Sequence, residues 1–576
     1  MELALLGVAA VVIVVVAAAF ARKLGIALPL LLAVVGAGLS FIPGAPDLDL
    51  DPEWILVLVL PPLLYSAAVN VPLVDFRRNL TPILGLGVLA VVLSAFATGT
   101  LLYLILPDLD YASAIALGAV IGPTDAVAAT SLAKRLGLPH RLVTILEGES
   151  LINDASALVL LRTALAAVGG AVSVGGALGQ FAWAVIVGAI IGLLLGWLSV
   201  LLRSRFSDDL LATTLSFVVP FVAYIGAEEL GASGVIAVVA AGLIIGHESA
   251  RRFTARTRLA ERINWRTVQF VLENGVFLFM GYQLEGYALG VVDDGYDLWV
   301  PIGIALLLVV VLIVMRGAFV APLLAWLRLR EARRVERGEW FEERVNEVRE
   351  RVGKAAAEGT DRPEVRNRLR RFERFARRQT AELDFLRKEG LGWRGGVVIS
   401  WAGMRGVVTV AAAQTIPANV PYRSELILVA LIVAVVTLAL GGLTLPPVIR
   451  ALRIPGPDGE DLADEQRELV AEIGSVTEES LRNPSLADDD GRPFAPDVIE
   501  QVRAEVAAIG KAARPPAEGP QSERQRQVQR LRELVLETQR AALLDARSSG
   551  AYSSRTINEV QSILDAVELR RPPRPD

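Results

Sequence analysis

Long blocks of apolar residues recur along the first 450 residues of the chain, and they constrain its fold more than any other feature. Each block is about 17 to 28 residues long, enough to cross a hydrocarbon layer of roughly 30 Å as an α-helix. We predict thirteen membrane spans. They cover approximately residues 3–21, 25–43, 53–70, 82–106, 111–133, 142–168, 176–202, 209–228, 231–247, 266–286, 297–327, 395–416 and 424–451. The pattern predicts an all-α polytopic membrane protein and excludes a large soluble enzyme.

The composition removes several kinds of site. The chain has no cysteine, so disulfides, thiolate metal sites and cysteine nucleophiles are excluded. It has two histidines, His140 and His247, which are too few for a zinc site or a histidine-based triad. The soluble parts carry no phosphate-binding glycine loop and no nucleotide-binding or RNA-binding signature. We therefore expect no cofactor and no nucleic-acid partner.

The positions of the basic residues predict the orientation of the spans. Arginine and lysine occur in every second loop, whereas the intervening loops hold Arg423 and a group of aspartates. Because cytoplasmic loops of membrane proteins carry the excess of basic residues, we expect the N-terminus outside and the C-terminus in the cytoplasm. The first apolar block is followed, not preceded, by basic residues, so we interpret it as a span of the plasma membrane and not as a cleaved signal peptide.

The chain divides into a membrane domain at residues 1–452 and a cytoplasmic helical region at 455–576. A basic, charge-alternating insert at 328–394 separates the eleventh and twelfth spans, and its pattern is typical of exposed helices with ion pairs between successive turns.

Three spans carry ionisable groups near the middle of the membrane, where each costs about 2.5–3.5 kcal/mol to insert. Span five contains Asp125 directly after Gly122-Pro123-Thr124, and span six contains the sequence Glu147 to Asp154. Span twelve contains Arg405 between two glycines. The glycines and proline interrupt the helices of spans five and twelve and free backbone carbonyls beside the charged groups. Such residues are functional candidates.

The two interrupted spans occupy corresponding positions if the chain contains two inverted halves, spans one to six and eight to thirteen. Interrupted helices at matching positions of inverted repeats are typical of the binding site of a secondary transporter. We therefore predict two inverted repeats whose broken helices cross at mid-membrane.

The residue types predict what binds there. The candidate site consists of two carboxylates, two hydroxyls and an amide, from Asp154, Asp125, Thr124, Ser150 and Asn153. Such oxygen ligands suit a hard cation. Two neighbouring buried carboxylates also repel each other, so either a proton or a cation stabilises them. Competition between the two predicts an ion/proton exchanger.

At these residues the chain resembles the sodium/proton exchangers of the bacterial monovalent cation:proton antiporter family, over about residues 1–450. The similar segments are Leu60–Tyr65, Gly122–Ala128, Glu147–Ala155, Ala232–Val238 and Met404–Val408. The Asn153-Asp154 pair is the most specific of them.

The resemblance implies that Asp154 binds sodium and proton in turn, and that Asp125, Thr124 and Ser150 line the same site. Asn153 occupies the position of a second aspartate in electrogenic relatives, which implies electroneutral exchange. Glu149 lies on the same polar arc of span six, and the resemblance implies a structural ion pair between it and Arg405. The family works as a homodimer in the lipid bilayer and transports by sliding of a core domain.

One position departs from the family pattern: Ser66 stands where relatives often carry an acid. This departure leaves potassium/proton or broad monovalent cation/proton exchange as an alternative, with lithium as a further candidate ion. Ser66 and Glu147 are candidates for the ion path. An intramembrane aspartyl protease is a remote alternative, because neither Asp125 nor Asp154 follows the Gly-x-Gly pattern of that class. A passive channel is disfavoured, because no filter-like loop is visible.

Overall fold

The computed structural model of the chain is almost entirely helical, and its described residues contain two isolated β-bridges but no strand. It describes residues 2–24, 27–43, 52–168, 174–206, 208–357, 391–454, 459–483, 486–487, 491–507 and 523–569. The chain forms two compact units. The membrane unit comprises Met1–Arg252, Leu259–Arg330 and Leu391–Gly456, and the second unit comprises Phe253–Arg258, Glu331–Gly390 and Pro457–Asp576.

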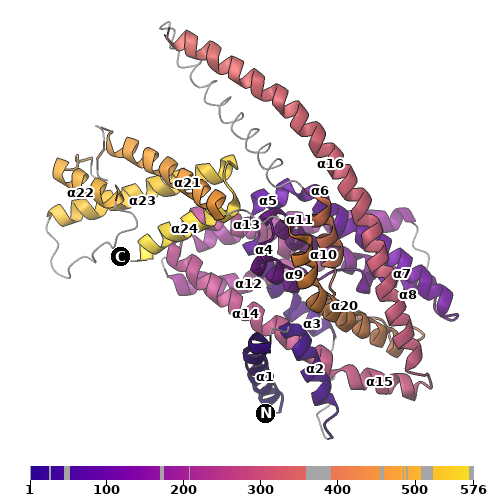
Figure 1. Cartoon of the computed structure of the whole chain (residues 1–576). Coiled ribbons are helices and arrows are strands. Elements are labelled where there is room, and N and C mark those ends of the chain that lie inside the picture. Colours follow the sequence, from indigo (N-terminus) through magenta and orange to yellow (C-terminus); the bar gives the residue numbers. More distant parts are fainter. Residues whose placement is uncertain are drawn as a thin grey trace. The chain divides into compact units, whose positions relative to one another are not determined.

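The membrane unit is built from helices that follow the predicted apolar blocks (Figure 1). In chain order they are α1 (Glu2–Leu24), α2 (Leu28–Ser40), α3 (Pro52–Leu58), α4 (Leu60–Asn70), α5 (Leu73–Arg78), α6 (Leu80–Leu84), the π-helical η1 (Gly85–Ala90), α7 (Val91–Ile105), α8 (Tyr111–Ile121), α9 (Ala126–Arg135), α10 (His140–Val168), α11 (Val174–Arg203), α12 (Asp209–Glu228), α13 (Gly234–Arg252), α14 (Ala255–Tyr282), α15 (Leu284–Asp293), α16 (Trp299–Ala357), α18 (Trp393–Trp401), α19 (Val407–Gln414) and α20 (Arg423–Leu452).

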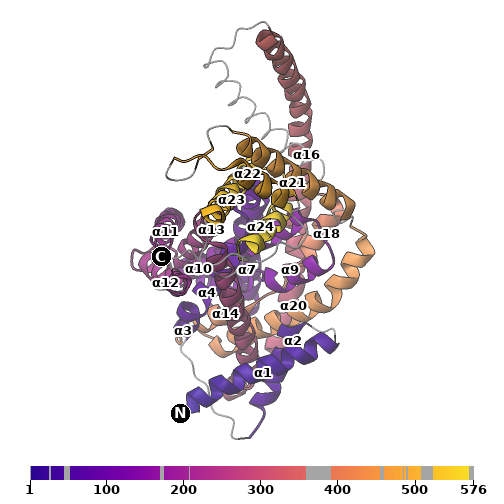
Figure 2. The ribbon, with the colours of Figure 1, turned by 90° about the vertical axis from the view of Figure 1, so that its left-hand side faces the viewer.

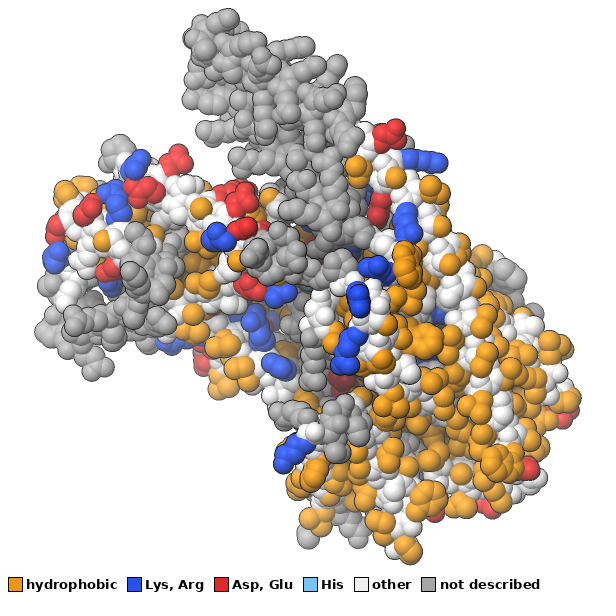
Figure 3. All heavy atoms as spheres, viewed as in Figure 1, with side chains coloured by type: hydrophobic (Ala, Val, Ile, Leu, Met, Phe, Trp, Pro, Cys, Tyr) orange, Lys and Arg blue, Asp and Glu red, His pale blue; other side chains and the backbone are white. Residues whose placement is uncertain are grey.

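Among the described residues, eight helices are long and apolar enough to cross a membrane. Shorter apolar helices lie at Leu5–Ala21, Leu28–Ser40, Leu56–Asn70 and Tyr111–Ile121. Figure 3 shows the corresponding surface, where hydrophobic side chains cover most of the visible face of the membrane unit. An integral, helical membrane protein is therefore confirmed, while the number of thirteen spans stays a prediction.

Both predicted interruptions are present. α8 ends at Ile121 and α9 begins at Ala126, and likewise α18 ends at Trp401 and α19 begins at Val407. Pro123 has no backbone N–H to donate within a helix, so the chain leaves the helical path there. The two extended segments lie against each other, and the Asp125 N–H donates to the Met404 carbonyl at 2.6 Å. This contact brings the fifth and twelfth predicted spans together at their breaks.

Close helix packing positions the elements around these breaks. α11 packs on α13 through a glycine stripe, where a Cβ at Gly192 would lie 2.1 Å from the Ala237 carbonyl oxygen. α13 in turn packs on α4, and α10 packs on α8 and η1. Figure 2 shows the same helices from the side, with α1 and α2 next to each other.

The basic insert begins as a continuation of α16, which runs through the predicted eleventh span and ends at Ala357. The first part of the insert is therefore helical, as expected from its charge pattern. Its second part, residues 358–390, lies outside the described residues, as do most of the predicted outer loops 44–52 and 169–175.

The C-terminal part of the second unit contains α21 (Gly459–Leu481), α22 (Pro496–Ala507), α23 (Glu523–Ser549) and α24 (Ser554–Leu569). These helices pack through two apolar clusters: Leu469, Ile473, Leu543, Ala546, Ile557, Val560 and Leu564 form one, and Leu481, Phe494, Val498, Val502, Val528, Leu531 and Val535 form the other. The Glu465 carboxylate accepts hydrogen bonds from the Ser553 and Thr556 hydroxyls at the start of α24.

Candidate functional site

A cavity of about 550 Å³ lies inside the membrane unit where the interrupted helices meet. Its walls come from α4, α9, α10, α14 and α19 and from the two breaks. The charged and polar lining residues are Asn70, Asp125, Thr130, Lys134, Glu147, Ser150, Asp154, Arg262, Arg266, Gln269, Glu273 and Thr409. The Lys134 side chain is 62% exposed, so this end of the cavity is open to solvent.

One face of α10 supplies three of the predicted residues. Glu147, Ser150 and Asp154 are three and four residues apart, a spacing that places them on the same side of a helix. Asp125 reaches the cavity from the break between α8 and α9, and it interacts electrostatically with Asp154. The Asp154 carboxylate forms no hydrogen bond or ion pair with another residue of the described ranges. The structure thus brings Asp154, Asp125 and Ser150 together around one space.

The position of Asp125 depends on a close approach at the second break. A Cβ added at Gly406 would lie 2.5 Å from Asp125 Oδ2, so only glycine leaves room for this carboxylate. Gly406 directly precedes α19, whose first backbone N–H groups lack helical acceptors. The positive end of a helix dipole stabilises a nearby negative charge, so α19 favours an anionic or cation-binding Asp125.

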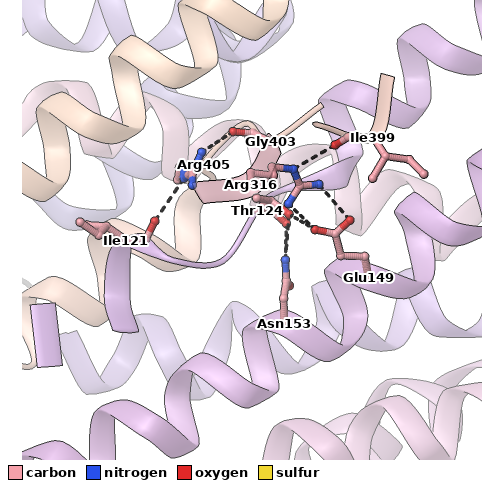
Figure 4. Close-up of polar contacts among 8 residues, drawn as sticks. All are labelled: Ile121, Thr124, Glu149, Asn153, Arg316, Ile399, Gly403 and Arg405. Carbon is pink, nitrogen blue, oxygen red and sulfur yellow. Dashed lines mark hydrogen bonds and ion pairs between the residues drawn. The ribbon is translucent and has the colours of Figure 1, made fainter. Parts of the chain in front are cut away.

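Thr124 and Asn153 are buried and are not among the residues that line the cavity. Figure 4 shows their side chains pointing toward each other. Asn153 Nδ2 donates to the Thr124 carbonyl at 2.8 Å and to its hydroxyl at 3.0 Å. The Thr124 hydroxyl donates to Glu149 Oε1 at 2.9 Å. The two side chains therefore tie the break after α8 to α10 in this conformation. The buried Asn153 Oδ1 has no hydrogen-bond partner among the described residues.

The predicted ion pair between Glu149 and Arg405 is wrong, because Arg316 of α16 is the partner of Glu149 (Figure 4). Arg316 Nη1 and Nη2 donate to the two carboxylate oxygens of Glu149 at 2.6 and 3.0 Å. Arg316 Nε also donates to the carbonyl of Ile399 at 2.9 Å. Both side chains are less than a tenth exposed. A buried, bidentate pair of this kind links α10, α16 and α18.

The Arg405 guanidinium forms its hydrogen bonds with backbone carbonyls, and Glu149 interacts with it only electrostatically, without a hydrogen bond. Its Nε donates to the carbonyl of Ile121 at 3.1 Å, and its Nη1 donates to the carbonyl of Gly403 at 2.5 Å. Ile121 is the last residue of α8, where carbonyls lack helical partners and the helix dipole is negative. The broken helix therefore provides direct hydrogen-bond acceptors for Arg405, where the sequence analysis expected the Glu149 carboxylate.

The two candidates for the ion path have different surroundings. Ser66 is buried on α4, and its hydroxyl donates to Gln269 Oε1 of α14 at 2.9 Å. Gln269 lines the cavity, whereas Ser66 does not. Glu147 lines the cavity and forms an ion pair with Lys134 at 2.6 Å.

Two charged residues of spans ten and eleven, Arg316 and Glu273, belong to the site although they are not among the candidate site residues predicted from the sequence. Arg316 is the only charged residue between Trp299 and Leu327, which was a signal for a buried partner on another helix. Glu273 lines the cavity from α14. It follows Arg262, Arg266 and Gln269 at intervals of four, three and four residues, and this polar stripe was visible in the sequence.

Comparison with known proteins identifies the family. The sequence model of the sodium/hydrogen exchanger transmembrane family matches residues 10–451. An uncharacterized Na(+)/H(+) exchanger of Mycobacterium tuberculosis (strain ATCC 25618 / H37Rv) is 30% identical, and the match covers 98% of this chain and 95% of that protein. A sodium, potassium, lithium and rubidium/H(+) antiporter of Bacillus pumilus is 31% identical over 47% of this chain and 41% of its own length.

The fold is also that of a solved antiporter. The structure of the sodium proton antiporter MjNhaP1 from Methanocaldococcus jannaschii matches with a TM-score of 0.55 at 17% identity, and the match covers 78% of this chain and 99% of that one.

The chain belongs to the sodium/hydrogen exchanger family, and it is a bacterial monovalent cation:proton antiporter. The family is one of membrane transporters and not of enzymes, so the intramembrane protease reading has no support.

Proposed function

We propose that the protein is a secondary active antiporter that exchanges protons for sodium, with both competing for Asp154. The observation that carries this proposal is the shared cavity: Asp154 lines it from α10, Asp125 lines it from the break before α9, and the two interact electrostatically. Two like charges in a low-dielectric site favour uptake of a positive charge. Either a proton or a sodium ion supplies this positive charge, so binding of one competes with binding of the other.

The cavity residues would act as follows. The Asp154 carboxylate holds a proton in one state and sodium in the other, and Asp125 and the Ser150 hydroxyl supply further oxygen ligands of the kind that hard cations prefer. Thr124 would join the site through its carbonyl or hydroxyl after Asn153 and Glu149 release it. Alternating access would carry the loaded site from one side of the membrane to the other, driven by the proton gradient.

Potassium/proton or broad monovalent cation/proton exchange is the second candidate. Ser66 supports it, since an acid found at this position in many family members is missing here. The name of the Bacillus pumilus relative, which includes potassium and rubidium, also favours a broad ion range.

The proposed arrangement in the cell is a homodimer in the plasma membrane with thirteen spans in two inverted repeats. The matched breaks before Ala126 and Val407 support the repeats. The alternation of basic and non-basic loops supports an outer N-terminus and a cytoplasmic C-terminus. Membrane lipid surrounds the apolar faces, and no cofactor takes part.

Everted membrane vesicles with an acidic interior provide the test. We expect proton release, followed with a pH-sensitive dye, when sodium or lithium is added. Vesicles from cells without the protein serve as the control. Release with potassium as well would assign the broader exchange. Absence of release with all three ions, in vesicles that contain the protein, would contradict the proposed function.

We also propose that the exchange is electroneutral, because Asn153 is a neutral residue beside Asp154 and hydrogen-bonds through its amide to Thr124. A single exchanging carboxylate carries the same net charge with a proton as with sodium. In proteoliposomes loaded with sodium, we expect proton uptake as sodium leaves. The signal of a voltage-sensitive dye should not change. A membrane potential that builds up with exchange would contradict electroneutrality.

A further inference from the structure

α14 presents a continuous polar stripe to the cavity. Arg262, Arg266, Gln269 and Glu273 all line it, and their spacing places them on one side of the helix. The stripe begins with the two arginines and reaches the acid Glu273 three turns further along the helix. α14 is thus a wall of the cavity, and it places a carboxylate there that none of the family motifs in this chain includes.

Glu273 lies next to the residue that Ser66 contacts. Ser66 donates to Gln269 Oε1 at 2.9 Å, and Gln269 precedes Glu273 by one helical turn and hydrogen-bonds to it. Glu273 also interacts electrostatically with Asp125, which lines the same cavity. Glu273 on α14 is therefore one residue removed from the side chain at position 66 of α4, with Gln269 between them.

The net charge of the cavity lining depends on Glu273. Three lining residues are basic (Lys134, Arg262 and Arg266), and four are acidic (Asp125, Glu147, Asp154 and Glu273). The fully ionised lining has one excess negative charge, which a single monovalent cation neutralises. Without Glu273 the lining would be neutral, and a bound cation would add a positive charge in a low-dielectric site, which is unfavourable.

We propose that Glu273 is a third cation-attracting carboxylate of this cavity. This inference rests on the proposed antiport function. The described residues contain no group of three or more acidic or histidine side chains arranged to hold one ion together. In this proposal Glu273 attracts the monovalent cation from the cavity wall and so contributes to the affinity for the cation.

The test is Glu273→Gln in everted vesicles, with sodium chloride as the added ion. We expect the apparent KM for sodium to rise about tenfold, because one charge is removed from a low-dielectric lining. The rate at saturating sodium should change little, since Asp154 is intact. The conservative variant Glu273→Asp should keep a KM near that of the wild type. The double variant Ser66→Glu/Glu273→Gln should recover most of the lost affinity.

Glu229→Gln is the control, because it removes an exposed carboxylate that does not line the cavity. Water screens this charge, so the KM should rise less than about twofold. An unchanged KM in folded Glu273→Gln protein, or equal effects of the two variants, would overturn the inference and leave antiport standing. Absence of exchange in the wild type would instead reject the proposed function. Sodium-dependent thermal stabilisation of the purified protein should fall in parallel in Glu273→Gln.

Discussion

Asp154→Asn is expected to lower cation/proton exchange at least about a hundredfold, because loss of a charge that directly holds the ion removes several kcal/mol of binding. The amide has nearly the same size, but it takes up no proton in the physiological range and gives a cation no negative charge. The Asp154 carboxylate forms no hydrogen bond or ion pair within the described ranges, and it faces the cavity. The substitution should therefore leave the fold unchanged.

Exchange in everted vesicles measures the loss, and the amount and thermal stability of the purified protein measure the fold. Glu229→Gln is the control, since it removes an exposed carboxylate that does not line the cavity. Exchange that survives in folded Asp154→Asn protein would remove this residue from the site. A protein that no longer folds would assign Asp154 a structural role instead.

Arg316→Met is expected to have the largest effect on stability, a loss of about 3–5 kcal/mol, because it leaves the buried Glu149 carboxylate without its counter-charge. The substitution also removes the donor to the Ile399 carbonyl. Glu149 would keep only the hydrogen bond from Thr124 among those described here. We expect little folded protein in the membrane, or a strongly lowered unfolding temperature in detergent.

Pairs of variants separate this ion pair from the one predicted from the sequence. Glu149→Gln combined with Arg316→Met should be no less stable than Arg316→Met alone, since the two residues form one interaction. Glu149→Gln combined with Arg405→Met should show nearly additive losses, because Arg405 bonds to backbone carbonyls. Additive losses with Arg316 and non-additive losses with Arg405 would contradict the observed pairing. Fluorescence-detected thermal unfolding of the detergent-solubilised protein measures the stability of each single and double variant.

The ion pair also has a consequence for how the site is supported. Through Glu149, Thr124, Asn153 and Arg316, the network joins α10 to the break after α8 and to α16 and α18. None of the four side chains lines the cavity. They hold the backbone that carries Asp125 and Asp154 and leave both carboxylates facing the space.

The sequence determined the features that depend on neighbouring residues along the chain. Apolar blocks produced the helices, and Gly122-Pro123 and Gly403 to Gly406 produced the two breaks, because these residues disfavour a continuous helix wherever they lie. The spacing along span six also placed Ser150 and Asp154 on one side of α10. The family and its candidate acids could be recognised from these local patterns.

Only the tertiary structure decided which groups meet across helices. Arg405 faces the carbonyl end of α8, and Arg316, distant in sequence, fills the place beside Glu149. Glu149 and Asp154 belong to the same arc of polar residues on α10. Helix packing buries Glu149 and leaves Asp154 facing the cavity. The physical reason is that a buried charge takes whichever counter-charge or dipole the packing brings near, and a sequence does not fix the distances between helices.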